Sequence, residues 1–125
     1  MRLAARPVGA AITPDDRVWY VDYAEGYLGV LDPRTGQFEE WRAPAAEQSR
    51  PYAMTVDDQN RLWFFETGIT PNRLVGFDPQ SEEFFGMTEV SGERNTVRHM
   101  VFDPRTSSIW FGTDTNNLGR AKIGS

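Results

Sequence analysis

The chain has 125 residues, no Cys and a formal net charge of −5, so disulfide and thiolate chemistry are excluded. Its 12 Arg and single Lys are scattered among 18 Asp and Glu, which leaves no basic patch and argues against nucleic acid as a partner. No apolar run reaches the roughly 18 residues that a membrane-spanning helix needs, so no membrane partner is expected.

The N-terminal stretch Met1–Ala5 is too short to be a repeat and corresponds to the end of an outer strand in a preceding one. Arg6 and Pro7 interrupt what would be the apolar segment of a secretion signal. We therefore expect no signal peptide in this chain and a soluble protein, whose compartment the absence of Cys leaves open.

The first repeat contains four strand-like runs separated by turns rich in Asp, Pro and Gly, which are turn-forming residues. The second run is apolar without a break at its centre, so both faces of that strand are expected to be covered. The predicted strands are Val8–Thr13, Arg17–Asp22, Tyr27–Asp32 and Phe38–Arg42.

The same skeleton occurs twice more. Trp19, Trp63 and Trp110 mark the register, 44 and 47 residues apart. The second copy predicts strands over Tyr52–Val56, Arg61–Glu66, Arg73–Asp78 and about Glu83–Thr88. The third copy follows a crossover at Ser91–Asn95 and predicts strands over His99–Asp103, Ser108–Thr113 and Leu118–Ile123, with no fourth strand.

A repeat of about 40–50 residues with four strand-like runs is typical of a propeller blade. With 11 Gly and 8 Pro and no sustained 3.6-residue period, no helix is expected. We predict an all-β fold: β-propeller blades, each a four-stranded antiparallel meander, in an incomplete arc that forms a single domain over residues 1–125. The blade repeats span about residues 6–49, 50–95 and 96–125.

Propeller blades bury their apolar faces only against neighbouring blades. An arc leaves one face bare at each end, and exposed apolar faces of several hundred Å² favour association. We therefore expect these faces to contact either the remaining blades of a larger propeller or further copies of the same chain.

Antiparallel pairing places the start of each inner strand beside the end of the second strand, at one rim of the axial channel. Because the inner strands line the channel, a small-molecule ligand is expected at this rim. The candidate site residues gathered there are Asp22, Arg50, Tyr52, Glu66, Arg98 and His99.

His99 is the only His and the only side chain that normally titrates near neutral pH. Together with Glu66 it is a candidate catalytic acid or base, and Asp22, Glu66 and His99 are candidate ligands of a divalent ion. Structural interpretations stand beside these. His99 can simply hydrogen-bond within the channel, and Glu66 can pair with a neighbouring Arg, since an unpaired buried charge is costly.

Tyr52, Arg98 and Arg50 are the candidate substrate-binding residues. Tyr52 can equally be a packing residue at the channel wall. Arg50 precedes Pro, as Arg6 does, and this repetition favours a structural role in pairing with the Asp-rich turns.

Four motifs define a pattern that covers nearly the whole chain. They are Asp32-Pro33-Arg34-Thr35-Gly36, Arg61-Leu62-Trp63-Phe64-Phe65-Glu66, Asn72-Arg73-Leu74-Val75-Gly76 and Asn117-Leu118-Gly119-Arg120. The pattern resembles the virginiamycin B lyase (streptogramin lyase) family of seven-bladed propellers, so the chain looks like the C-terminal part of such a ring. Gluconolactonase and NHL-type propellers share much of the pattern.

The resemblance implies a metal-assisted elimination that opens a cyclic depsipeptide at its ester bond. A His removes the proton next to the carbonyl, and Mg²⁺ held by Glu and His side chains stabilises the enolate. In the resemblance, Glu66 matches a family Glu after Trp-Phe, and Asp22 stands where another Glu would be.

Two alignments of His99 with the family His remain open. Tyr52 stands where the family places a His after Pro, and His99 falls at the next such position to within one residue. Aligned instead from the turn that follows, Arg98 matches Tyr52 and His99 matches Ala53.

Three functions follow from this sequence. The first is a Mg²⁺-assisted carbon–oxygen lyase acting on a cyclic ester or other small molecule, an activity not expected of this stretch in isolation. The second is a non-catalytic propeller that binds a ligand or a protein. The third is a lactone hydrolase of the gluconolactonase type, for which only Asp22 and Glu66 offer metal-binding acids.

Overall fold

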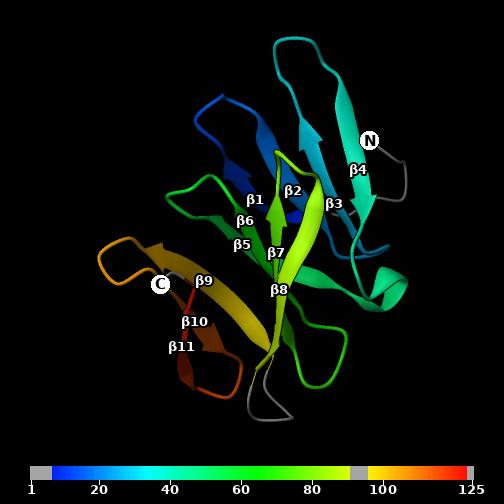
Figure 1. The fold of residues 1–125 in the computed structure, drawn as a ribbon. Helices are drawn as coiled ribbons and strands as arrows, with labels where there is room; N and C mark the ends of the chain where they lie inside the picture. The colour runs from blue at the N-terminus through cyan, green and yellow to red at the C-terminus, as the bar shows by residue number, and fades with distance from the viewer. Residues whose placement is uncertain (1–6, 91–95, 124–125) are drawn as a thin grey trace.

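The computed structural model describes residues 7–90 and 96–123, whose strands form three antiparallel sheets placed side by side (Figure 1). The all-β prediction is confirmed, since the described residues contain no α-helix and none of their sheets closes on itself. Three predicted features lie outside the described residues. They are the strand remnant Met1–Ala5, the crossover Ser91–Asn95, and Arg6, for which pairing with the Asp-rich turns was predicted.

The first sheet is a meander in the order β1-β2-β3-β4. Its strands are β1 (Pro7–Ile12), β2 (Val18–Asp22), β3 (Tyr27–Leu31) and β4 (Phe38–Arg42). Each agrees with the sequence prediction to within one residue at either end, because the turn-forming residues delimit the strands closely.

The second and third sheets repeat this order. The second contains β5 (Pro51–Val56), β6 (Leu62–Glu66), β7 (Arg73–Asp78) and β8 (Glu83–Glu89). The third contains β9 (Val97–Asp103), β10 (Ser108–Thr113) and β11 (Leu118–Lys122). Strand β9 starts two residues earlier than predicted, because it continues through an irregularity in the ladder to pair Val97 with Thr113.

The crossover from the first to the second sheet contains a short 3₁₀ helix, η1 (Ala46–Gln48), that the sequence did not predict. Gly26 has a φ of 78°, and a Cβ at that residue would lie 1.9 Å from the carbonyl oxygen of Ala46. The crossover therefore packs directly on the turn between β2 and β3. No helix in the described part of the chain is long and apolar enough to cross a membrane.

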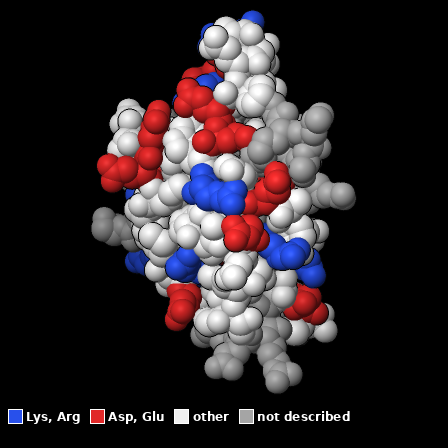
Figure 2. All heavy atoms as spheres, turned by 90° about the vertical axis from the view of Figure 1, so that its right-hand side faces the viewer, with Lys and Arg blue, Asp and Glu red and all other residues white. Residues whose placement is uncertain are grey.

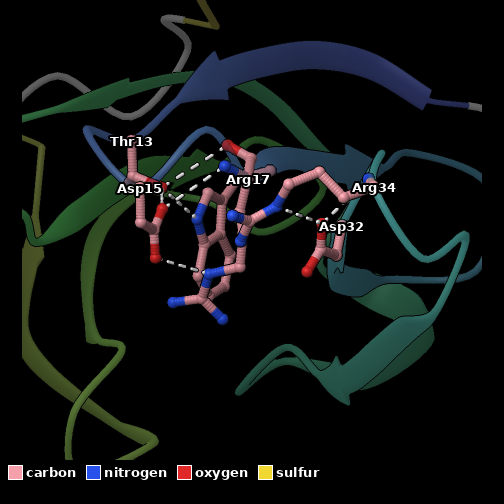
Figure 3. A network of polar contacts seen from close by, with 6 residues as sticks. Thr13, Asp15, Arg17, Asp32 and Arg34 are labelled. Atoms are coloured by element: carbon pink, nitrogen blue, oxygen red, sulfur yellow. Dashed lines mark hydrogen bonds and ion pairs between the residues drawn. The ribbon is translucent and has the colours of Figure 1, made fainter.

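Side-chain hydrogen bonds close the turn between β1 and β2 (Figure 3). Asp15 accepts hydrogen bonds from the Thr13 hydroxyl and from Nε of Arg17, and the indole N–H of Trp19 donates to Thr13 at 3.1 Å. The hydrogen bond from Thr13 is the main reason that the pKa of Asp15 is lowered, and Arg17 contributes to the same shift. The turn thus links a surface ion pair to a core indole.

Asp57 occupies the corresponding turn of the second sheet. Its carboxylate accepts hydrogen bonds from the main-chain N–H groups of Gln59 and Arg61, from Nε of Arg61 and from the indole of Trp63 at 2.9 Å. The Asp-rich stretch that follows β5 is therefore a turn whose first Asp anchors the Trp of its own blade.

The three Trp residues occupy equivalent places in their sheets. Trp19 pairs with Ala11, Trp63 with Thr55 and Trp110 with Val101. The next residue of each inner strand continues the same pairing, so the register predicted from the Trp spacing is confirmed.

Two apolar cores separate the sheets. The first lies between sheets one and two and includes Trp19, Val21, Leu28, Phe64 and Phe77. The second lies between sheets two and three and includes Trp63, Phe65, Leu74, Ile109 and Phe111. Strand β6 contributes alternate residues to both cores and is buried along its whole length, which is why Leu62–Phe65 is apolar without a break.

The outward face of the third sheet is partly open. Val101 is 60% exposed and Leu118 is 74% exposed, and Trp110 is only half-buried. The corresponding faces of the first two sheets are covered by the next sheet. Association of this face with further blades or with a second copy of the chain remains a prediction.

Charged side chains of both signs are interspersed on the face of the molecule seen in Figure 2. At turns in the described residues, charged side chains form close pairs, such as Arg34 with Asp32 and Arg105 with Asp103. This distribution agrees with the scattered Arg residues of the sequence.

Candidate functional site

The starts of the inner strands meet the ends of the second strands at one rim, as the sequence predicted. The rim pairs are Pro7 with Asp22, Pro51 with Glu66 and Val97 with Thr113. The inner strands β1, β5 and β9 lie next to one another, so the rim runs continuously across the three sheets.

The ladder is irregular directly after each rim pair, which marks a β-bulge. A bulge redirects the side chain of the extra residue. Tyr52 and Arg98 occupy this position in the second and third sheets, so both side chains belong to rim residues that depart from regular strand geometry.

The pairing decides between the two alignments of His99. Met54 pairs with Phe64 and Met100 pairs with Phe111 at equivalent places in their sheets. The residue before each Met is Ala53 in one sheet and His99 in the other. Arg98 therefore corresponds to Tyr52 and His99 to Ala53, which is the alignment counted from the turn.

Glu66 is fully buried at the end of β6. Its Oε1 accepts a hydrogen bond from Nε of Arg73 at 2.8 Å and forms an ion pair with Nη2 of Arg73 at 2.6 Å. Its Oε2 accepts the main-chain N–H of Ala45 at 2.8 Å. Both carboxylate oxygens thus have partners, and Glu66 joins the second sheet to the crossover that leads into it.

Asp22 occupies the same position in the first sheet and is also fully buried. Its Oδ1 accepts the main-chain N–H of Ala24 at 3.0 Å, and its carbonyl oxygen accepts the N–H of Gly26 at 3.0 Å. Asp22 thereby shapes the turn into β3. The third sheet has Thr113 at this position, so an acid occurs at only two of the three rim pairs.

His99 lies on the outward face of the third sheet. It pairs with Gly112 and lines a shallow depression of that face together with Val101, Trp110 and Leu118. Its neighbour Met100 packs into the core on the opposite face. His99 therefore faces away from the second sheet.

The predicted metal ligands Asp22, Glu66 and His99 do not converge. Glu66 alternates along β6 with residues of the second core and faces the first sheet, where it meets Ala45. His99 faces outward from the third sheet, and packed sheets are about 10 Å apart. Within the described residues no three His, Cys, Asp or Glu side chains are grouped to hold a metal ion. These residues do not fit a Mg²⁺ site within this chain.

The structure does bring the predicted substrate-binding residues together, along with one that the sequence did not single out. The Arg98 guanidinium lies over the Tyr52 ring at 5.1 Å, and the Arg50 guanidinium lies over the Tyr23 ring at 5.4 Å. The two Tyr rings meet edge to face with centroids 6.2 Å apart. We call Arg50, Tyr23, Tyr52 and Arg98 the rim row.

Tyr23 was missed because it lies in a turn, where an aromatic residue gives no periodic signal. Its position directly after the strand-ending Asp22 was the available sign. Arg73 could also have been identified from the sequence as the partner of Glu66, because the two residues lie opposite one another on neighbouring strands.

A second concave region lies between the second and third sheets, with a volume of about 600 Å³. Trp63, Phe85, Phe111, Arg120 and Ile123 are among its lining residues. It runs beside β11, where the first two sheets have a fourth strand. It is therefore the main alternative to the rim as a ligand site.

No protein-family model matches the chain, and no curated protein matches it in sequence. Solved structures do match. The chain superposes on a catalytically inactive variant of virginiamycin B lyase from Staphylococcus aureus, solved with quinupristin, with a TM-score of 0.84 and 22% sequence identity. The match covers 98% of this chain and 39% of that one, so this chain spans about two fifths of the length of that protein.

Other matches are proteins with different names. Hydrazine synthase from Kuenenia stuttgartiensis gives a TM-score of 0.79 at 15% identity, covering 94% of this chain and 34% of that chain. The PQQ-bound aldose sugar dehydrogenase from Streptomyces coelicolor gives 0.65 at 17% identity, covering 90% and 40%. At such identities the likeness shows the fold alone.

The sheets and these matches together define the chain as an arc of a β-propeller. Its fold is similar to that of a stretch of virginiamycin B lyase, and the fold that the sequence resemblance implied is confirmed.

The Glu66–Arg73 pair predicts a large stability effect. Replacing Arg73 with Met leaves the Glu66 carboxylate buried without its cation, which typically costs about 3–5 kcal/mol. We expect the lower end, because the Arg73 side chain is 26% exposed. Urea unfolding of Arg73→Met measures this. The control Arg34→Met removes a surface pair and should cost less than about 0.5 kcal/mol. Equal losses would contradict a structural role for Glu66.

Proposed function

We propose that this chain is the ligand-binding part of a propeller and that a small organic molecule binds at the rim row. The observation that carries this proposal is the contact between bulge residues of neighbouring sheets, with Arg98 over Tyr52. Arg98 is exposed and Tyr52 is half-buried, so the pair has both a solvent-facing charge and an aromatic surface.

The buried acids support binding over catalysis within this stretch. Glu66 and Asp22 are fully buried and hydrogen-bond to groups of the protein itself, such as Arg73 and the N–H of Ala24. A general acid or base must reach the proton that it transfers in a bound substrate. The rim row contacts solvent, whereas these carboxylates do not.

Ligand mapping by NMR tests the location. We expect a panel of small neutral, anionic and cationic aromatic compounds to include at least one that shifts the signals of Tyr52 and Arg98, and Tyr52→Leu should abolish the shifts of Arg98. The matched control is Phe85→Leu, which alters the region beside Trp63. Ligands that shift only Trp63 and Phe111, or a panel without any binder, would contradict the proposal.

A second candidate is a carbon–oxygen lyase activity of a longer propeller that contains this arc. It is favoured by the coverage of 98% of this chain by virginiamycin B lyase and by the matching Glu66. Because Asp22, Glu66 and His99 do not converge on a Mg²⁺ site, such a protein would need metal ligands from beyond the described residues. A lactone hydrolase activity would likewise need metal ligands from beyond the described residues.

Mass spectrometry distinguishes these activities. The 125-residue chain is incubated with quinupristin, with and without Mg²⁺. The binding proposal predicts unchanged compound in both samples. A ring-opened product of unchanged mass would indicate elimination, and a product heavier by one water would indicate hydrolysis. Either product, if lost in both Glu66→Ala and His99→Ala variants that still fold, would establish the catalytic roles predicted from the sequence.

A further inference from the structure

The class of ligand that binds at the rim row follows from its side chains, and this inference rests on the proposed function. We propose that the rim row recognises a small organic carboxylate with a flat apolar body. Arg50 and Arg98 supply the charge for the carboxylate, and Tyr23 and Tyr52 supply the surface for the body.

The first reason for a carboxylate ligand is that Arg50 and Arg98 have no acidic partner within the described residues. Six of the described Arg residues pair with an acid, and they are Arg17, Arg34, Arg42, Arg61, Arg73 and Arg105. Arg50 and Arg98 form no ion pair within the described residues, although both are exposed and the chain carries a net charge of −5. Two uncompensated cations therefore lie in one row of an acidic protein.

The aromatic contacts position these cations without neutralising them. Each guanidinium lies over a Tyr ring, at 5.1 Å for Arg98 and 5.4 Å for Arg50. A cation–π contact uses the flat face of the guanidinium, so the N–H donors at its edge stay available. The edge-to-face contact of the two Tyr rings joins both pairs into one surface.

The main chain beneath the row is also unusual. Arg50 has a φ of 43°, which is in the left-handed region that a bulky residue rarely adopts. The N–H and hydroxyl of Thr67 both donate to its carbonyl oxygen, at 3.3 and 2.6 Å. Costly main-chain conformations of this kind cluster at functional sites. Arg98 is the extra residue of the bulge in β9, so both ends of the row rest on irregular backbone.

The nearby acids do not offset the charge of the row. Glu66 is the acid of the second rim pair, and its carboxylate is bound by Arg73 and by the N–H of Ala45. Asp22 is fully buried and accepts the N–H of Ala24. Both carboxylates hydrogen-bond beneath the surface, whereas the guanidinium groups are exposed.

The chemistry of the four side chains selects the ligand class. A guanidinium presents a planar fork of donors that matches a carboxylate in two parallel hydrogen bonds. Tyr rings add contact with flat apolar groups. A cationic ligand would be repelled, a neutral one would lose the charge-assisted bonds, and an anion without a body would leave the rings unused. An aromatic carboxylate matches both the guanidinium donors and the Tyr rings of the row.

Benzoate is the probe for this inference. Titration of the intact chain, followed by NMR, should give a saturable complex that shifts the Tyr52 and Arg98 signals and weakens as salt is added. Either Arg98→Gln or Arg50→Gln, whichever removes the guanidinium that holds the carboxylate, should weaken binding about tenfold or more, and full affinity in both variants would overturn the inference. Arg105→Gln is the matched control, since Arg105 is exposed and pairs with Asp103 in a turn, and should leave the affinity unchanged.

Three comparison ligands make the inference refutable independently of the rim proposal. Benzamide keeps the ring without the charge, acetate keeps the carboxylate without the ring, and inorganic phosphate is an anion of another class. All three should bind at least about tenfold more weakly than benzoate. Benzamide binding equal to benzoate would overturn the charge recognition while leaving the rim as a ligand site. Acetate or phosphate binding equal to benzoate would overturn the role of the Tyr rings, and Tyr52→Leu checks this separately.

Discussion

The packing of each sheet against the next is the constraint on which the structure depends. A four-stranded meander has two apolar faces, and in this chain each face is buried only by a neighbouring sheet. Strand β6 shows the consequence, because Leu62 and Phe64 enter one core while Trp63 and Phe65 enter the other. The same stacking aligns the inner strands, so residues more than 40 positions apart in sequence meet at one rim.

This stacking explains what the sequence could predict. The equivalent Trp residues and the apolar run of β6 result directly from the repeated packing of the sheets, so the blades could be predicted from the sequence. The alignment of His99 could not, because the turn between β9 and β10, counted between equivalent residue pairs, is one residue longer than the corresponding turn between β5 and β6. Helix η1 was missed because Ala46 and its neighbours carry no turn signal, and its position depends on contact with Gly26. The sequence indicated a neighbouring Arg as the partner of Glu66, and Arg73 lies opposite it, but the burial of Glu66 arises from the packing of the sheets, which no local pattern expresses.

The candidate site changes character once the sheets are in place. The residues chosen for chemistry, Glu66 and His99, face different sides of the arc, and the acid is bound by Arg73. The residues chosen for binding, Tyr52 and Arg98, contact one another. Strand alternation decides this outcome, because two residues at the same rim share a site only when they project to the same side. The position of a residue along its repeat predicts whether it lies at the rim. The face of the strand from which its side chain projects decides which other side chains it meets there.

Native-state hydrogen exchange tests the stacking most directly. Amides of β6 (Leu62–Glu66) lie between two cores and should exchange only on global unfolding, whereas those of β11 (Leu118–Lys122), whose sheet is covered on one face, should exchange at least about tenfold faster through local opening. Equal protection of β6 and β11 at low protein concentration would contradict the account, because it would mean that a sheet keeps its full stability without a neighbour on each side.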